Sequence, residues 1–135
     1  MKMIKPAYYI GLTLSMLFGV WHFFVPWMFQ WYSYIPYENL AVGIRYTNFF
    51  FSLLLFGTSL LLILLGKKVF NGSKEAFVFY GFIVFVWFCR SIITFVEPWP
   101  IEPIAWAAYG QQIAAIVLFI ILLIPFIFLF KKRGR

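Results

Sequence analysis

The stretch AFVFYGFIVFVWFCRSIITFV, from Ala76 to Val96, is apolar throughout except for a few small polar residues and Arg90. As an α-helix, a run of this length can cross the hydrocarbon core of a bilayer, which is about 30 Å thick. An arginine inside such a helix costs several kcal/mol unless it finds a polar partner, water or the headgroup layer. The stretch therefore predicts a membrane-spanning helix. The rest of the chain is expected to provide an environment that stabilises Arg90.

The composition of the whole chain also indicates an integral membrane protein. Of its 135 residues, 64% are hydrophobic and 11% are charged, whereas a soluble domain is about half apolar and a quarter charged. The long apolar runs predict a single transmembrane domain over residues 1–135. The first run follows Lys2 and Lys5 as in a signal peptide, but no small-residue cleavage site follows it, so we expect the run to be retained.

Four membrane spans are predicted, at about residues 6–29, 46–65, 76–96 and 104–130. Residues 30–45 are rich in Trp and Tyr, as in segments that lie at headgroup level, and Pro36 interrupts any helix there. Short turns are expected at residues 66–75 and 97–103. The expected fold class is all-α, an integral membrane four-helix antiparallel bundle.

Small residues lie on one face of the first span, where Gly11, Ser15 and Gly19 follow a small-xxx-small pattern. Such a face lets another helix approach closely, so we expect helix packing there.

The distribution of Lys and Arg predicts the orientation. The N-terminus, the 66–75 turn and the C-terminal tail carry nine of these residues, whereas the opposite side carries only Arg45. Under the positive-inside rule, both the N- and C-termini are therefore expected inside, with the chain in the cell membrane. The same rule accounts for the net charge of +7, so we do not expect nucleic acid as a partner.

The strongly polar side chains lie in the outer half of the predicted spans. With a rise of about 1.5 Å per residue, His22, Arg90 and Gln111 lie roughly 9 to 12 Å below the outer helix ends. Asn48 lies just under the outer surface, and Glu97 shares a helix face with Arg90 and is a candidate counter-charge. If these side chains face one another, they form a polar ligand-binding pocket open to the outer side, above an apolar plug.

Each of these residues also has a simpler interpretation. Arg90 can extend to the outer headgroups, and His22 can be an ordinary histidine hydrogen-bonded between helices. Gln111 and Gln112 point about 100° apart, so one of them is expected only to form a hydrogen bond between helices. The lone Cys89 is expected to be inert packing.

Several kinds of chemistry are excluded by the residue inventory. One histidine cannot supply a bis-histidine haem site, and no His, Cys and carboxylate cluster suits a metal. We therefore expect no cofactor and no metal, and we favour a non-enzymatic role over an enzymatic one. The first span also has no acid, which sets the chain apart from small multidrug exporters.

The segment Gly19-Val20-Trp21-His22-Phe23-Phe24-Val25-Pro26, together with Asn48-Phe49-Phe50-Phe51-Ser52, resembles small DoxX-like four-span membrane proteins. The resemblance covers about residues 19–60 and implies a four-span membrane fold. Some members of that family are membrane subunits associated with quinone or thiosulfate redox systems, and others are assembly partners. The resemblance implies no catalytic residue in this chain.

Three functions remain open at this point. The first is a non-enzymatic accessory or ligand-binding subunit whose outward pocket holds a lipid, a quinone-like molecule or a small anion. The second is a small oligomeric transporter that uses Arg90 and His22 as coupling charges. The third is an enzyme with His22 as acid or base. The expected partners are membrane lipids, with a membrane-complex partner or a second copy of the chain.

Overall fold

The computed structural model describes residues 3–98 and 105–133, and this part of the chain contains helices and no strands. In chain order, the elements are α1 (Ile4–Met28), η1 (Trp31–Tyr34), α2 (Glu38–Leu64), α3 (Gly66–Phe70), α4 (Lys74–Val96) and α5 (Ala105–Arg133). The all-α prediction is confirmed. The helices α1, α2, α4 and α5 are long and apolar enough to cross a membrane.

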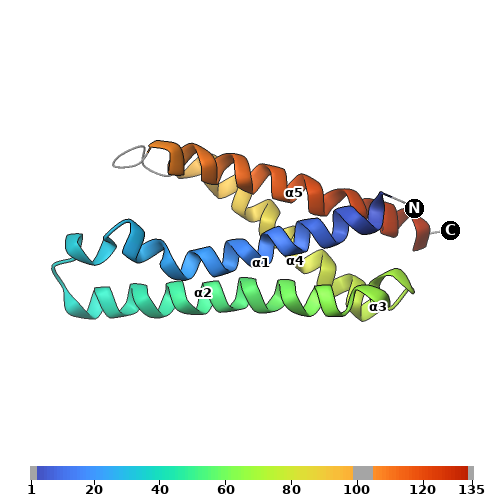
Figure 1. Ribbon diagram of the computed structural model, residues 1–135, viewed down its shortest axis with the longest axis horizontal. Coiled ribbons are helices and arrows are strands. Elements are labelled where there is room, and N and C mark those ends of the chain that lie inside the picture. The colour runs from blue at the N-terminus through green and yellow to red at the C-terminus, as the bar shows by residue number, and fades with distance from the viewer. Residues whose placement is uncertain (1–2, 99–104, 134–135) are drawn as a thin grey trace.

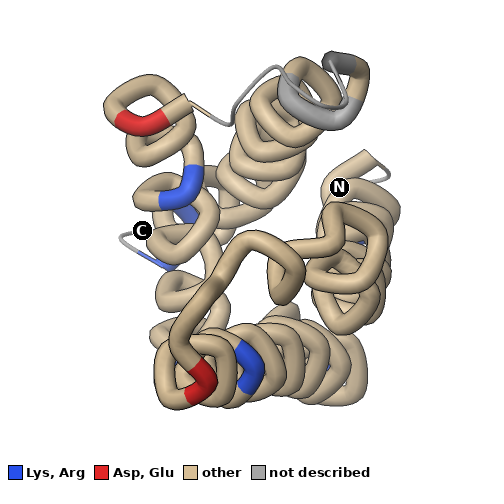
Figure 2. Tube along the Cα trace, turned by 90° about the vertical axis from the view of Figure 1, so that its left-hand side faces the viewer, with Lys and Arg blue, Asp and Glu red and all other residues tan. Residues whose placement is uncertain are grey.

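Successive long helices run in opposite directions, so the bundle has two distinct ends (Figure 1). We call them the η1 end, where α1 passes to α2, and the α3 end, where α2 passes to α4. Helix α1 packs against both α2 and α5, and α4 packs against α5. Helices α2 and α4 make only sparse contact with each other, and the view along the bundle shows the four long helices as separate columns (Figure 2).

The predicted packing face of α1 contacts two different helices. A Cβ atom added to Gly11 would lie 2.8 Å from the Leu122 side chain on α5, and one added to Gly19 would lie 2.7 Å from the backbone nitrogen of Phe56 on α2. Both distances are too short for a real side chain, so these glycines allow the close approach of α5 and α2. The expected use of this face in helix packing is confirmed.

A hydrogen-bonded layer crosses the middle of the bundle. The Ser15 and Ser59 hydroxyl oxygens lie 2.8 Å apart, and the Trp87 indole N–H donates to Ser15 Oγ at 2.8 Å. All three side chains are buried. This layer joins α1, α2 and α4, and we call it the serine layer.

Two tyrosines fill the bundle between the serine layer and the α3 end. Tyr8 and Tyr80 are fully buried, and their rings meet edge to face at 4.7 Å. The Tyr8 hydroxyl donates to the Leu62 carbonyl, and the Tyr80 hydroxyl donates to the Leu122 carbonyl, both at 2.6 Å. This half of the bundle is therefore closely packed, with its few polar groups paired.

The largest differences from the predicted spans are an earlier start of α2 and an additional short helix. Helix α2 begins at Glu38, although the second span was predicted to begin at residue 46. Gln30 in the left-handed region and Pro36 end the preceding helical turns, but nothing after Tyr37 interrupts a new helix, and Glu38 suits its positive N-terminus. The predicted 66–75 turn contains the short helix α3. Most of the predicted 97–103 turn lies outside the described residues.

The α3 end is held together by contacts between distant parts of the chain. Ser73 caps α4 by accepting a hydrogen bond from the Ala76 backbone N–H, and the Arg133 guanidinium donates to the Ser73 carbonyl at 2.5 Å. At the start of α1, the Lys5 ammonium lies over the Phe70 ring of α3. The beginning of α1 and the end of α5 therefore lie at the same end of the bundle (Figure 1).

Candidate functional site

Arg90 is held inside the bundle by a neighbouring helix. Its Nη2 donates to Gln111 Oε1 on α5 at 2.7 Å, and Gln111 is only 3% exposed. The next residue of α4 also contacts α5, because the Ser91 hydroxyl donates to the Ala115 carbonyl at 3.1 Å. This hydrogen bond helps to align the two helices that carry Arg90 and Gln111. The guanidinium is thus anchored to α5 rather than extended along α4 toward its end.

His22 lies on α1 and is surrounded by aromatic rings. It is 6% exposed, and its imidazole lies 5.0 Å from the Phe18 ring, 5.3 Å from the Trp21 ring and 5.1 Å from the Phe51 ring. Asn48 donates its side-chain N–H to the His22 backbone carbonyl at 2.9 Å, which joins α2 to α1. Asn48 therefore fixes the helix that carries Phe51 beside the histidine.

Two adjoining hollows lie between α2 and α4, and we call them together the α2–α4 cleft. The hollow nearer the η1 end has a volume of about 500 Å³ and is bordered by His22, Asn48, Phe51 and Arg90. The second, about 310 Å³, also includes Phe51 and Arg90 in its lining. Because α2 and α4 barely touch, the cleft occupies the space that other helix pairs fill with packed side chains.

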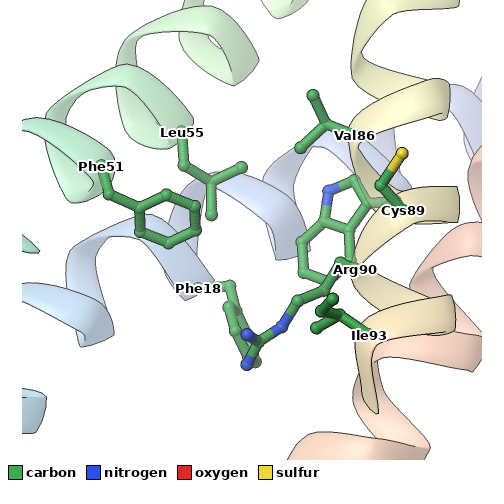
Figure 3. Close-up of a pocket in the computed structure, with 8 residues that line it drawn as sticks. Phe18, Phe51, Leu55, Val86, Cys89, Arg90 and Ile93 are labelled. Carbon is green, nitrogen blue, oxygen red and sulfur yellow. The ribbon is translucent and has the colours of Figure 1, made fainter. Parts of the chain in front are cut away.

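The walls of the second hollow are almost entirely apolar. Phe51 and Leu55 extend from α2 toward Val86 and Cys89 on α4, and the Arg90 guanidinium projects between them beside Phe18 (Figure 3). Arg90 is the charged group among these walls. The arrangement is a cationic hydrogen-bond donor in an aromatic and aliphatic cleft.

Three buried nitrogen atoms in this region have no hydrogen-bond partner among the described residues, namely His22 Nε2, Arg90 Nε and Gln111 Nε2. Leaving a buried polar group unpaired costs about 1 to 3 kcal/mol. His22 and Arg90 border the α2–α4 cleft, whereas Gln111 borders a separate hollow of about 400 Å³ between α1 and α5. Two of the three unpaired nitrogen atoms therefore belong to residues that border the cleft, and both atoms are themselves buried.

Glu97 is not brought to this group of side chains. It is exposed, and within residues 3–98 and 105–133 it forms no ion pair with Arg90. The shared helix face that suggested the pair ends too early, because α4 stops at Val96 and Glu97 leaves the helical conformation. Of the five predicted site residues, His22, Asn48 and Arg90 border the α2–α4 cleft, Gln111 is bonded to Arg90 but borders another hollow, and Glu97 lies apart.

Sequence reasoning missed two parts of the cleft. Phe18 and Phe51 pack against the imidazole, and Phe18 could have been found from its spacing, since it lies one helical turn before His22. Cys89 was expected to be packed and inert, but it is exposed and borders the cleft. It borders the cleft because residues 86, 89, 90 and 93 share one face of α4.

The chemistry available in this region is hydrogen bonding and charge rather than metal ligation. No group of three or more His, Cys, Asp or Glu side chains that could hold a metal ion occurs among the residues that the structure describes. Comparison with known proteins gave no match, either to a protein-family model, to a curated protein or to a solved structure. The resemblance to DoxX-like proteins therefore stays a prediction.

Proposed function

We propose that this protein is a multi-pass protein of the cell membrane that binds an oxygen-bearing amphiphile in the α2–α4 cleft. In this proposal it acts as a non-enzymatic ligand-binding or accessory subunit, and both termini lie inside. The observation that carries the proposal is Arg90, a guanidinium held between helices with its Nε unpaired beside an apolar cleft.

The proposed membrane placement rests on the helices and on the charges. The four long apolar helices match the thickness of a bilayer. The turn at the α3 end contains Lys67, Lys68 and Lys74, and the last described residues are basic as well. Under the positive-inside rule the α3 end faces the cytoplasm, which puts the η1 end and the wider hollow toward the outside.

Binding is favoured over transport because the cleft ends inside the bundle. The serine layer, in which Ser15 is hydrogen-bonded to both Ser59 and Trp87, closes the cleft on the side of the α3 end. Beyond that layer Tyr8 and Tyr80 are fully buried and hydrogen-bonded. A ligand that enters the cleft therefore meets a closed floor and no continuous polar path.

The walls and the polar groups define the kind of ligand. Ligand sites are mostly apolar, with a few polar groups that fix the orientation of the ligand. Here Phe51, Leu55 and Ile93 provide apolar surface, and the Arg90 guanidinium, which borders the cleft, provides a donor for an oxygen atom. A lipophilic molecule with a carbonyl, carboxylate or phosphate oxygen satisfies both.

Cys89 allows a direct test, because it is the only cysteine in the chain and borders the cleft. The purified protein in mild detergent is labelled with a small fluorogenic bimane reagent, with and without decyl-quinone or oleate. We expect at least one of the two probes to slow the labelling of Cys89 several-fold. The matched control is Cys89→Ala combined with Phe85→Cys, which moves the thiol to an exposed position of the same helix.

Two results would contradict the proposal. If neither probe changes the labelling rate of Cys89, or if both slow the control thiol equally, the α2–α4 cleft is not the binding site. Flux of a probe through liposomes that contain only this protein, abolished by Arg90→Ala, would instead identify a transporter.

A further inference from the structure

The positive charge of Arg90 has no acidic partner among the described residues. Its observed partner, Gln111, is neutral, and the described acids Glu38, Glu75 and Glu97 are all exposed at helix starts or ends. The fourth acid of the chain, Glu102, lies outside the described residues. Within residues 3–98 and 105–133, the guanidinium is therefore hydrogen-bonded once but not neutralised.

An uncompensated guanidinium is much less stable in an apolar surrounding than one beside an anion. Burying a charge is costly unless it is paired and hydrogen-bonded. A neutral oxygen, such as a quinone carbonyl, would accept a hydrogen bond from the Arg90 guanidinium but would leave the charge in place. A carboxylate or a phosphate would accept the hydrogen bond and also neutralise the charge. Arginine binds these groups through short, charge-assisted hydrogen bonds.

The walls of the cleft decide between a free anion and an anionic amphiphile. Next to Arg90 the lining is Phe51, Leu55, Val86 and Ile93 (Figure 3), and Phe51 and Ile93 are exposed. The cleft therefore opens sideways between α2 and α4, where lipid chains would lie. A hydrated inorganic anion would gain nothing from these walls, whereas an acyl chain would bury apolar surface on them.

We propose that the ligand of the α2–α4 cleft is an anionic, single-chain membrane amphiphile that enters from the side and supplies the counter-charge of Arg90. This inference rests on the proposed function and narrows it to one class of ligand. The anionic headgroup accepts a hydrogen bond from the Arg90 guanidinium, and the chain lies against Phe51, Leu55 and Ile93. Carboxylate and phosphate headgroups share this chemistry.

Three probes with the same oleoyl-type chain test the role of charge, and protection of Cys89 from bimane labelling is again measured. The probes are oleate, lysophosphatidate with one oleoyl chain, and the neutral oleyl alcohol. Because charge-assisted hydrogen bonds are stronger than hydrogen bonds to a neutral group, we expect the better anionic probe to protect at about tenfold lower concentration than the alcohol. The order of oleate and lysophosphatidate identifies a carboxylate or a phosphate as the preferred headgroup.

Gln111→Glu is the most informative variant, because it keeps the size of the side chain and places a carboxylate against Arg90 Nη2. If the ligand supplies the counter-charge, this internal carboxylate competes with it. We expect weaker protection by the anionic probes, by about tenfold, with unchanged protection by oleyl alcohol. Arg90→Gln should abolish the preference for anions, and size-exclusion chromatography checks that each variant is folded.

Arg45→Gln is the matched control, since Arg45 is an exposed cation near the η1 end whose guanidinium lies over the Tyr32 ring. It should leave the preference for anions unchanged. Equal protection by oleate, lysophosphatidate and oleyl alcohol would overturn the inference but leave the proposed function intact. An effect of Arg45→Gln as large as that of Arg90→Gln would have the same consequence. Failure of all three probes and of decyl-quinone to protect Cys89 would overturn both.

Discussion

At the scale of single residues, the common level of the polar side chains along the bundle could be predicted, but not their pairing. Counting along each helix put His22, Arg90 and Gln111 at one level, and the structure brings them together. Helical spacing suggested Glu97 as the partner of Arg90, whereas the actual partner is Gln111 on a different helix. Contacts between helices depend on how each helix is rotated, and no spacing within one helix contains that information.

The Arg90–Gln111 pair predicts a specific loss of stability. Gln111→Leu removes the acceptor of Arg90 Nη2, so we expect the free energy of unfolding in detergent to fall by about 1 to 3 kcal/mol. Gln112→Leu, at a half-buried neighbouring position, should change it by much less. Thermal unfolding followed by circular dichroism measures both. Equal effects of the two substitutions would show that the hydrogen bond is not the cause.

At the scale of helices, the small-residue face of α1 was predicted correctly, but its two partners were not. Gly11 lies against α5 and Gly19 lies against α2, so α1 is the helix that holds the bundle together. The start of α2 at Glu38 was missed because Trp and Tyr near an interface occur both in helices and in irregular segments. Composition indicates the depth of such residues better than their backbone conformation.

Gly19 tests the close packing of α1 on α2. In Gly19→Ala the new methyl group would meet the Phe56 backbone at 2.7 Å, and backbone cannot move aside as easily as a side-chain end. We expect destabilisation by about 1 to 3 kcal/mol, as for other overpacked interiors. Gly57→Ala is the control, because a Cβ there meets no atom within 4 Å. A drop in melting temperature of the same size for Gly57→Ala would contradict this explanation.

At the scale of the whole molecule, four apolar helices followed directly from the sequence, whereas the arrangement of neighbours did not. In a lipid-exposed bundle both the core and the outer surface are apolar, so the hydrophobic pattern does not identify the buried face of each helix. Exposed Phe50 and Leu54 and buried Leu55 and Leu62 on α2 illustrate this point. The sparse contact between α2 and α4, and hence the cleft, could not be predicted for this reason.

The proposed orientation can be measured in intact cells. Two single-cysteine proteins are made in a Cys89→Ala background, one with Ser33→Cys at the η1 end and one with Asn71→Cys at the α3 end. Both positions are exposed. With the α3 end inside, a membrane-impermeant maleimide should label the first protein and spare the second until the cells are opened. The reverse pattern would place both termini outside.

The loose α2–α4 pair also bears on how selective the protein is. Helix α2 is anchored to α1 through Asn48 and Ser59, and α4 is anchored to α5 through Arg90 and Ser91. The two pairs are joined by the packing of Gly11 against α5, by the Tyr8–Tyr80 contact and by the Trp87–Ser15 bond, whereas α2 and α4 touch only sparsely, so the α2–α4 side is the least restrained. We expect tolerance toward chain length and unsaturation, with discrimination concentrated on the headgroup.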